Sequence, residues 1–541
     1  MATTERKPRR WRRRLLRWIG WGALALAVLM GSGVLLADRL APRATGAPGH
    51  VLPLQDAQTE IDRELAPLLA AHPGQTGVLT AADGLDAFAM RALAARKAGR
   101  SLDAMYFIWK DDLAGRLLAR EVVAAAERGV RVRLLLDDIN LGGLEAQLLA
   151  MDAHPNIELR IYNPFRNRDE AWRIVEMLQR LRSLNHRMHN KAWIADGRVA
   201  VVGGRNIGEQ YFSAADVNFR DLDLLLFGPA VADVSGVFDT YWNSTAAVPI
   251  AALHPRATAQ LAAMIVELDV DAAVPEAAPY LARVDASHGV MAYRSRSLAP
   301  HWTSALRIVA DPPLKGRKDA RRCPLDALDS AGCETWMVDR IVADVTSARR
   351  EALIITPYFV PGDAGAAALV ALAKGGTPIG IVTNSLAAND VAAVHAGYAA
   401  QRGKLLAAGV RLYELRSSRD PVRHVKAFGS AGASLHTKAY VLDGRRGFVG
   451  SFNLDPRSAD LNTEMGVLFD DPVLAQVVRY EYQRLASPGL SWEAFLDGEG
   501  EVRWRDAAVQ PPVVLDTEPE STWVQRLKAR VFGWLPIESQ L

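Results

Sequence analysis

The chain has 541 residues, enough for two large domains or for three or four smaller ones. Hydrophobic residues make up 50% and charged residues 23%, a balance typical of globular proteins that argues against disorder for the bulk of the chain. The net charge is only +3, so composition alone does not indicate a protein with a strong overall field for nucleic acid.

The N-terminus combines a basic cluster with an apolar segment. Arginines dominate residues 1–17, and residues 18–37 carry no charge. Such an uncharged segment is long enough to cross a hydrocarbon core of about 30 Å as a helix. Residues 1–40 are therefore predicted to form a basic N-terminus and a transmembrane anchor, with the basic end in the cytoplasm and the rest of the chain on the far side. A cleaved signal peptide is the alternative.

The first half is predicted to begin with a strand, a helix and a second strand, over residues 102–109, 114–128 and 130–136. An Ala-rich helix over residues 257–268 and an irregular region then indicate a connection between two halves.

A pair of cysteines follows this connection. Cys323 and Cys333 lie in one short segment, which in an exported domain favours a disulfide that closes a surface loop. A zinc site would need further ligands, and two unpaired thiols are the remaining alternative.

The second half repeats the order of the first, with a strand, a helix and a strand over residues 352–360, 364–373 and 378–383. Strands that alternate with helices in this way predict an α/β fold made of two duplicated βαβ domains, with mixed or parallel sheets. The predicted divisions after the anchor are a first domain at 41–255, a connecting segment at 256–300, a second domain at 301–500 and a C-terminal tail at 501–541.

The tail contains an amphipathic pattern over residues 523–537. The apolar residues on one side are Trp523, Leu527, Val531 and Trp534, and the cations on another are Arg526, Lys528 and Arg530. This pattern is typical of a helix that lies at a membrane interface. A helix that packs against its own domain explains it equally well.

Each half also carries the motif His-x-Lys-x4-Asp, followed by a Gly-rich turn and an Asn. The first copy comprises His189, Lys191, Asp196 and Asn206, and the second comprises His436, Lys438, Asp443 and Asn453. The interval from His to Asn is the same in both copies. A single His-x-Lys has little meaning, but two complete copies at matched depth are specific.

The side chains of these motifs suit the transfer of a phosphodiester. If the motif lies on a strand, His and Lys point to the same side. One imidazole can attack phosphorus, and the other can exchange a proton with the leaving and incoming alcohols. The lysines and the Asn amides can hold the non-bridging oxygens, so no metal or other cofactor is required. Each His needs an acid to orient it, and the candidates are Asp221 in the first half, with Asp223 as a substitute, and Glu464 in the second.

On these motifs the chain resembles the phospholipase D superfamily, and within it the bacterial cardiolipin synthases of the C type. Similar stretches include residues 186–212, 241–244, 383–398 and 450–464. The resemblance implies a pseudo-dimer of two sandwich domains with both motifs at one cleft. It also implies a covalent phosphohistidine intermediate, with His189 as nucleophile and His436 as general acid and base. Asp196 and Asp443, although part of the motif, are expected to brace it rather than to contact substrate.

The resemblance further implies a phosphatidyltransferase. Together with the predicted anchor it gives a single-pass protein of the bacterial inner membrane, with its catalytic domains on the periplasmic side. It would bind phosphatidylglycerol, and phosphatidylethanolamine is a further candidate. No nucleic acid is expected, because the sequence shows no basic stripe with interleaved aromatic residues. The alternatives are a phospholipase D that releases phosphatidic acid and a periplasmic nuclease or phosphodiesterase. A non-enzymatic lipid-binding protein is disfavoured because both motifs are intact.

Overall fold

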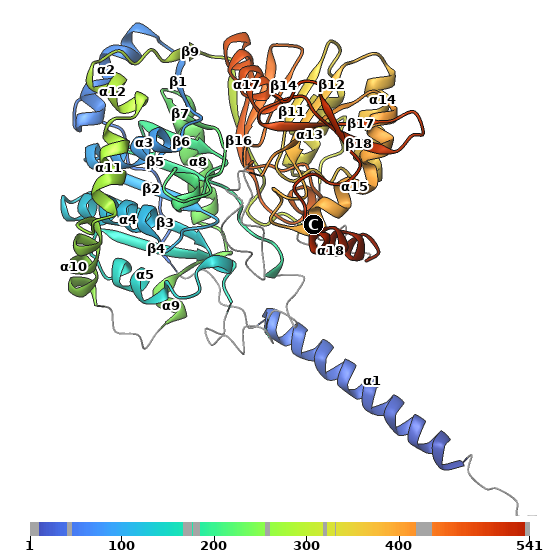
Figure 1. The fold of residues 1–541 in the computed structure, drawn as a ribbon. Helices are drawn as coiled ribbons and strands as arrows, with labels where there is room; N and C mark the ends of the chain where they lie inside the picture. The colour runs from blue at the N-terminus through green and yellow to red at the C-terminus, as the bar shows by residue number, and fades with distance from the viewer. Residues whose placement is uncertain are drawn as a thin grey trace, which may run out of the picture.

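The computed structural model describes residues 10–39, 46–165, 176, 184–254, 260–316, 322–330, 332–417 and 435–535. Figure 1 shows two α/β halves side by side and a long N-terminal helix, α1 (Arg10–Arg39), that projects away from them. Within the described ranges, no helix has both the length and the apolar character needed to cross a membrane. The structure thus does not confirm the transmembrane anchor predicted over residues 18–37.

The described part of the first half is built on a nine-stranded mixed sheet. In spatial order its strands are β8 (Ala247–Pro249), β4 (Ile157–Tyr162), β3 (Arg131–Asp137), β2 (Ser101–Tyr106), β5 (Ala192–Ala195), β6 (Val199–Gly203), β7 (Asp223–Phe227), β1 (Thr76–Ala81) and β9 (His301–Thr303). Strands β2, β3 and β4 are parallel, whereas β5, β6 and β7 are antiparallel to their neighbours. The predicted strands at 102–109 and 130–136 correspond to β2 and β3.

The helices of the first half cover both faces of this sheet. They are α2 (Glu60–Ala71), α3 (Gly84–Lys97), α4 (Leu113–Glu127), α5 (Glu145–Asp152), α8 (Ala230–Trp242), α9 (Ile250–Leu253), α10 (Leu261–Ala272), α11 (Ala277–Asp285) and α12 (His288–Arg294), with short 3-10 turns at Asp138–Asn140 and Glu209–Tyr211. Helices α10, α11 and α12 pack on α3 and α4. Asp83 and Asp112 are the N-cap residues of α3 and α4. Their side chains accept hydrogen bonds from free backbone N–H groups of the first turn.

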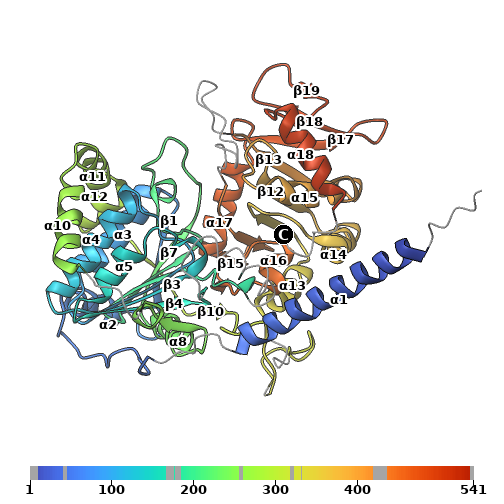
Figure 2. The same ribbon diagram turned by 90° about the horizontal axis from the view of Figure 1, so that it is seen from below.

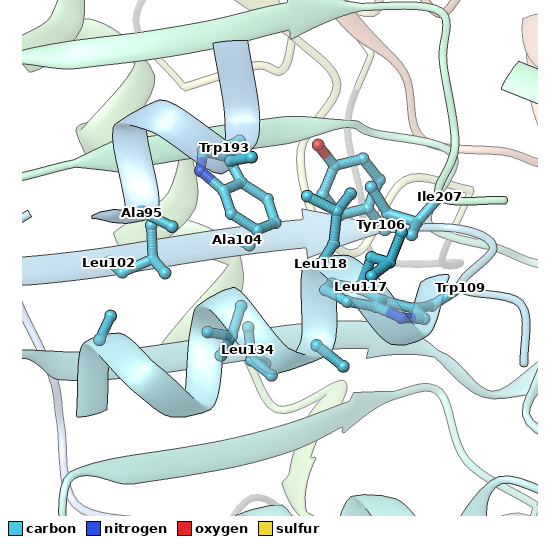
Figure 3. Close-up of a cluster of buried hydrophobic side chains, with 14 of the residues drawn as sticks. Ala95, Leu102, Ala104, Tyr106, Trp109, Leu117, Leu118, Leu134, Trp193 and Ile207 are labelled. Atoms are coloured by element: carbon cyan, nitrogen blue, oxygen red, sulfur yellow. The ribbon is translucent and has the colours of Figure 1, made fainter. Parts of the chain in front are cut away.

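Alternation along the strands separates two cores. In β2, Leu102, Ala104 and Tyr106 belong to a core with residues of α3 and α4, whereas Met105 belongs to a second core that contains α8 and residues of the other half. Figure 3 shows the first of these cores, in which Trp109 and Trp193 belong to one cluster with Leu118. All residues of β2 are buried, and Asp103, on the same face as Met105, pairs with Arg133 at 2.7 Å, so the strand lies in the middle of a covered sheet.

The second half repeats this plan on a sheet for which ten strands are described. In spatial order they are β10 (Leu306–Ala310), β16 (Met465–Asp470), β15 (Arg446–Gly450), β14 (Ala439–Leu442), β11 (Ala352–Ile355), β12 (Ile379–Asn384), β13 (Arg411–Leu415), β17 (Ser491–Leu496), β18 (Val502–Asp506) and β19 (Val513–Leu515). Its helices are α13 (Met337–Thr346), α14 (Gly362–Lys374), α15 (Ala392–Ala407), α16 (Pro456–Asp460), α17 (Pro472–Leu485) and α18 (Trp523–Gly533). The order β10-β16-β15-β14-β11-β12-β13 matches β1-β7-β6-β5-β2-β3-β4 of the first half, so the duplication is confirmed.

A shared core joins the two halves. Val234 and Phe238 of α8 belong to one buried cluster with Val478 of α17 and Val467 of β16. Helix α8 also contacts β10, and Figure 2 shows α17 on the side of the second half that faces the first. Burial of this shared apolar core makes the joined halves the favourable state.

Cys323 and Cys333 form the disulfide that their spacing favoured.

Candidate active site

Backbone pairing between the halves brings each histidine beside the other half. Met188 forms a parallel bridge with Thr463, and the N–H of His189 donates to the carbonyl of Thr463 at 2.9 Å. The second motif pairs with the first half in the same way, because Leu435, next to His436, forms a parallel bridge with Arg220. The two motifs therefore meet at the contact between the halves, although each lies in its own domain.

The pairing of histidines with acids crosses between the halves. Nδ1 of His189 donates to Oε2 of Glu464 at 2.8 Å, and Nδ1 of His436 donates to Oδ2 of Asp221 at 2.6 Å. Both carboxylates are fully buried. Asp223, the substitute for Asp221, instead pairs with Arg91 at 2.9 Å and does not face a histidine.

The His-x-Lys residues do not lie on strands. Strands β5 and β14 begin at Ala192 and Ala439, so both motifs occupy the extended segments just before them. The expectation of a strand over these residues is wrong, because the backbone N–H groups of His189 and His436 donate to Thr463 and Arg220 of the facing half rather than to a sheet neighbour. This placement puts the two imidazoles at the ends of the central strands, where the two sheets approach each other.

The two acids are held in different ways. Glu464 accepts hydrogen bonds from the hydroxyls of Ser451 and Ser458, at 2.5 and 2.9 Å, in addition to the bond from His189. Asp221 accepts one from the backbone N–H of Leu222 at 2.8 Å. The position equivalent to Ser451 is Gly204, where a Cβ atom would lie 2.5 Å from Oδ1 of Asp221. The shorter acid therefore approaches the backbone at a position that only glycine leaves open.

Both lysines are buried and anchored beside the histidines. The Nζ of Lys191 donates to the carbonyl of His189 at 2.5 Å, and that of Lys438 donates to the carbonyl of His436. Burial lowers the pKa of Lys191 well below its usual value and lowers the pKa of Lys438 to about 8. Glu464 and Asp221 oppose this shift, because their charges favour the ammonium form.

The same surroundings keep the imidazoles neutral. Burial, followed by the charges of Lys191 and Lys438, lowers the pKa of both His189 and His436 well below the usual 6.5. Because Nδ1 carries the proton that is donated to the acid, Nε2 keeps its lone pair. A neutral imidazole with a free Nε2 is the form that can attack an electrophile.

The two Asn residues have different surroundings. The carbonyl of Asn206 accepts from the N–H of Ile108 at 3.2 Å, and its amide donates to the hydroxyl of Tyr211 at 3.0 Å. Oδ1 of Asn453 is buried without a hydrogen-bond partner among the described residues. The predicted contact of both amides with substrate stays a prediction.

The motif aspartates lie at turns and hold the backbone. Oδ1 of Asp196 accepts from the N–H groups of Arg100 and Ser101 at 2.7 and 3.0 Å, at the start of β2. Asp443 accepts from the N–H of Arg350 at 2.6 Å, before β11. Both aspartates have φ near +55°, which is typical of a tight turn. Their carboxylates thus tie each motif strand to the central strand of its sheet.

Aromatic side chains, which sequence reasoning missed, surround both imidazoles. The ring of Phe107 lies 5.1 Å from that of His189, while Tyr211 and Phe219 lie 5.1 and 5.2 Å from His436. Phe107 directly follows β2, so the position of that strand was the available signal. Ser451 and Ser458 were also missed, because nothing local in the sequence links a serine hydroxyl to Glu464.

Both halves of the chain are similar to known proteins. The family model described as "Cardiolipin synthase, PLD-like domain" matches residues 94–242 and 341–486, one match in each half. Cardiolipin synthase C of Escherichia coli (strain K12) is 40% identical over 87% of this chain and 98% of its own. An uncharacterized protein of Helicobacter pylori (strain J99) is 31% identical over 81% of this chain and 84% of its own. The crystal structure of phosphatidylserine synthase from Haemophilus influenzae Rd KW20 shares the fold, with a TM-score of 0.54 and 14% identity over 88% of this chain and 99% of its own.

Proposed function

The chain belongs to the family of cardiolipin synthases with a phospholipase D-like domain, and from this premise we propose that it transfers a phosphatidyl group to phosphatidylglycerol. The observation that carries the proposal is the crossed pairing of His189 with Glu464 and of His436 with Asp221. This arrangement supplies two imidazoles, each oriented by a buried acid, at a single site. The donor would be a glycerophospholipid, either phosphatidylglycerol or phosphatidylethanolamine.

In the first step, Nε2 of His189 attacks the phosphorus of the donor. A phosphorus–nitrogen bond forms while the bond to the leaving alcohol breaks, and His436 gives that alcohol a proton. His436 is neutral in the resting site, so the negative charge of the bound phosphodiester has to raise its pKa before it can act as an acid. We assign the nucleophile to His189 because of the resemblance to the family.

In the second step, the hydroxyl of phosphatidylglycerol attacks the phosphohistidine. His436 takes the proton of that hydroxyl, a phosphorus–oxygen bond forms and Nε2 of His189 leaves. Lys191 and Lys438 stabilise the charge that grows on the non-bridging oxygens in both steps. Water in place of the alcohol would release phosphatidic acid, so exclusion of water from the site decides between synthesis and hydrolysis.

The proposed location is the bacterial inner membrane, with α1 as an anchor and the two domains on the periplasmic side. The support comes from the uncharged segment at 18–37, which follows a basic cluster, and from the disulfide, which suits an oxidising compartment. Membrane fractionation with alkaline carbonate, followed by protease treatment of spheroplasts, tests this location. Release of the intact chain by carbonate, or protection of its domains from protease, would contradict it.

Lipid analysis in a host without its own cardiolipin synthases tests the activity. Wild type is compared with His189→Ala, His436→Ala and the control His301→Ala, which alters a histidine that pairs with Asp471 outside the site. We expect cardiolipin from wild type and control, and none from the two site variants. Phosphatidic acid in place of cardiolipin would identify a hydrolase. If neither lipid changes although the protein is folded, the synthase proposal fails and nuclease activity should be assayed.

A further inference from the structure

Helix α18 at the C-terminal end presents two opposite faces. One face packs on α15, with Gln525, Ala529 and Phe532 partly buried toward it. The opposite face is apolar and open to solvent. Its residues and exposed fractions are Trp523 69%, Val524 38%, Leu527 51%, Val531 44%, Trp534 84% and Leu535 48%. The helix is therefore docked on its own domain and still has an uncovered apolar face.

Cations border this apolar face. With 3.6 residues per turn, Arg530 falls along one edge and Lys528 along the other, and both are exposed. Trp523 and Trp534 lie at the two ends of the helix. An apolar stripe with tryptophans and flanking cations fits the boundary between headgroups and acyl chains of an anionic bilayer.

The helix is held firmly in this orientation. Glu518, in the segment before it, accepts hydrogen bonds from Arg402 at 2.8 Å and from His395 at 3.1 Å, both on α15. Thr522 caps the helix by accepting from the N–H of Gln525 at 3.2 Å. Since docking uses the opposite face, these contacts fix the apolar stripe outward instead of covering it.

The position of α18 also suits membrane contact. Figure 1 shows α18 at the edge of the second half that lies toward α1. The exposed side chains of α1 include Trp18 and Leu29. Among the described residues, the two elements with the most exposed tryptophan therefore lie on one side of the molecule.

We propose that α18 is a second membrane contact, which lays Trp523, Leu527 and Val531 into the surface of a bilayer that contains anionic phospholipid. It would hold the second half against the membrane while Lys528 and Arg530 bind lipid phosphates. The contact goes beyond the proposed function, because it requires neither histidine and no turnover.

Site-directed labelling of the full chain in vesicles tests the contact. Both native cysteines are in the disulfide, so an environment-sensitive fluorophore can be attached selectively to Leu527→Cys. The matched control is Met291→Cys, an exposed apolar position on α12 in the other half. In vesicles of phosphatidylglycerol and phosphatidylcholine with a doxyl-labelled lipid, we expect quenching at 527 and none at 291.

Charge variants test whether the cations beside the stripe bind anionic lipid. Lys528→Gln with Arg530→Gln should lower the affinity of α18 for the anionic vesicles by about fivefold for each cation removed. High salt should lower that affinity as well. A label at 527 that stays in water overturns the proposal. So does a label that becomes protected without vesicles as protein concentration rises, since a second copy would then cover the stripe. His189→Ala should keep the quenching, so a failure of the proposed catalysis leaves this result unchanged.

Discussion

Glu464 and Asp221 orient the two histidines through unequal surroundings. Glu464 accepts from two serine hydroxyls, and burial raises its pKa to about 7, whereas Asp221 lies against the backbone beside Gly204. A carboxylate in this position fixes which imidazole nitrogen carries the proton and stabilises the imidazolium that forms during transfer. The inequality is consistent with two histidines that have different tasks.

Amide variants test this role of the acids. Glu464→Gln and Asp221→Asn should each lower kcat by about 10³- to 10⁴-fold, because an amide no longer favours the reactive tautomer. The assay is phosphatidyl transfer in vesicles. The control Glu481→Gln removes a buried carboxylate that pairs with Arg484 on α17, and it should leave kcat near wild type. Retention of most activity in either site variant would rule out the crossed pairs as part of the machinery.

The buried lysines should limit activity at alkaline pH. Burial lowers the pKa of Lys438 to about 8, so this side chain loses its charge as pH rises through that value. Since kcat/KM reports the free enzyme, it should fall above about pH 8. Lys438→Arg keeps its charge at these pH values and should remove the part of the fall in kcat/KM that comes from Lys438, even at lower activity. An alkaline limb that is unchanged in this variant would mean that another group is responsible.

The turns at Asp196 and Asp443 show how one side chain aligns two elements. Each carboxylate accepts from backbone N–H groups at the start of a central strand, β2 or β11, and so joins that strand to β5 or β14, the strand within its own motif. Asp196 is fully buried, whereas the contacts of Asp443 lie closer to solvent. Loss of the acceptor costs more stability when the N–H donor is buried than when the donor can form a hydrogen bond with water.

Stability and activity should separate at these turns. Asp196→Ala should lower the free energy of unfolding by about 3 kcal/mol, and Asp443→Ala should lower it less. Denaturant unfolding measures this free energy. The kcat per folded molecule of both variants should stay within about tenfold of wild type. A loss of kcat as deep as that of His189→Ala, with normal stability, would show that these aspartates take part in the chemistry.

The complete site exists only when both halves are present in one molecule. His189 and Glu464 are 275 residues apart in the chain, and His436 and Asp221 are 215 apart. The shared core of α8, α17 and the two sheets holds them together. A separate half would expose that core and would lack the acid for its own histidine.

Mixing of variants tests this unity. His189→Ala and His436→Ala, purified separately and reconstituted together in the same vesicles, should show no recovery of transfer, because every chain carries a damaged site. The control is co-reconstitution of wild type with either variant, which should give activity in proportion to wild type. Recovery in the mixture would mean that the active site is assembled from two chains, contrary to the crossed pairing within one.

The predictions made from local pattern were close to the structure. Residues 114–128 and 364–373 correspond to α4 and α14, and residues 378–383 correspond to β12, because apolar periodicity depends only on residues close together in the chain. The strand expected at 352–360 is shorter, since β11 ends at Ile355. The expected strand over the His-x-Lys residues was wrong, because the backbone N–H groups of both histidines pair with the other half.

The sequence by itself determined the kind of chemistry, through residue types that recur at one spacing in two halves. It also determined the duplicated α/β plan and favoured the disulfide, which the structure then showed, because these depend on local pattern and short separation. The tertiary structure alone decided which acid faces which histidine, that Asp221 rather than Asp223 is the partner, and that the apolar face of α18 stays uncovered. Those features depend on contacts between residues far apart in the chain, and no local pattern specifies such contacts.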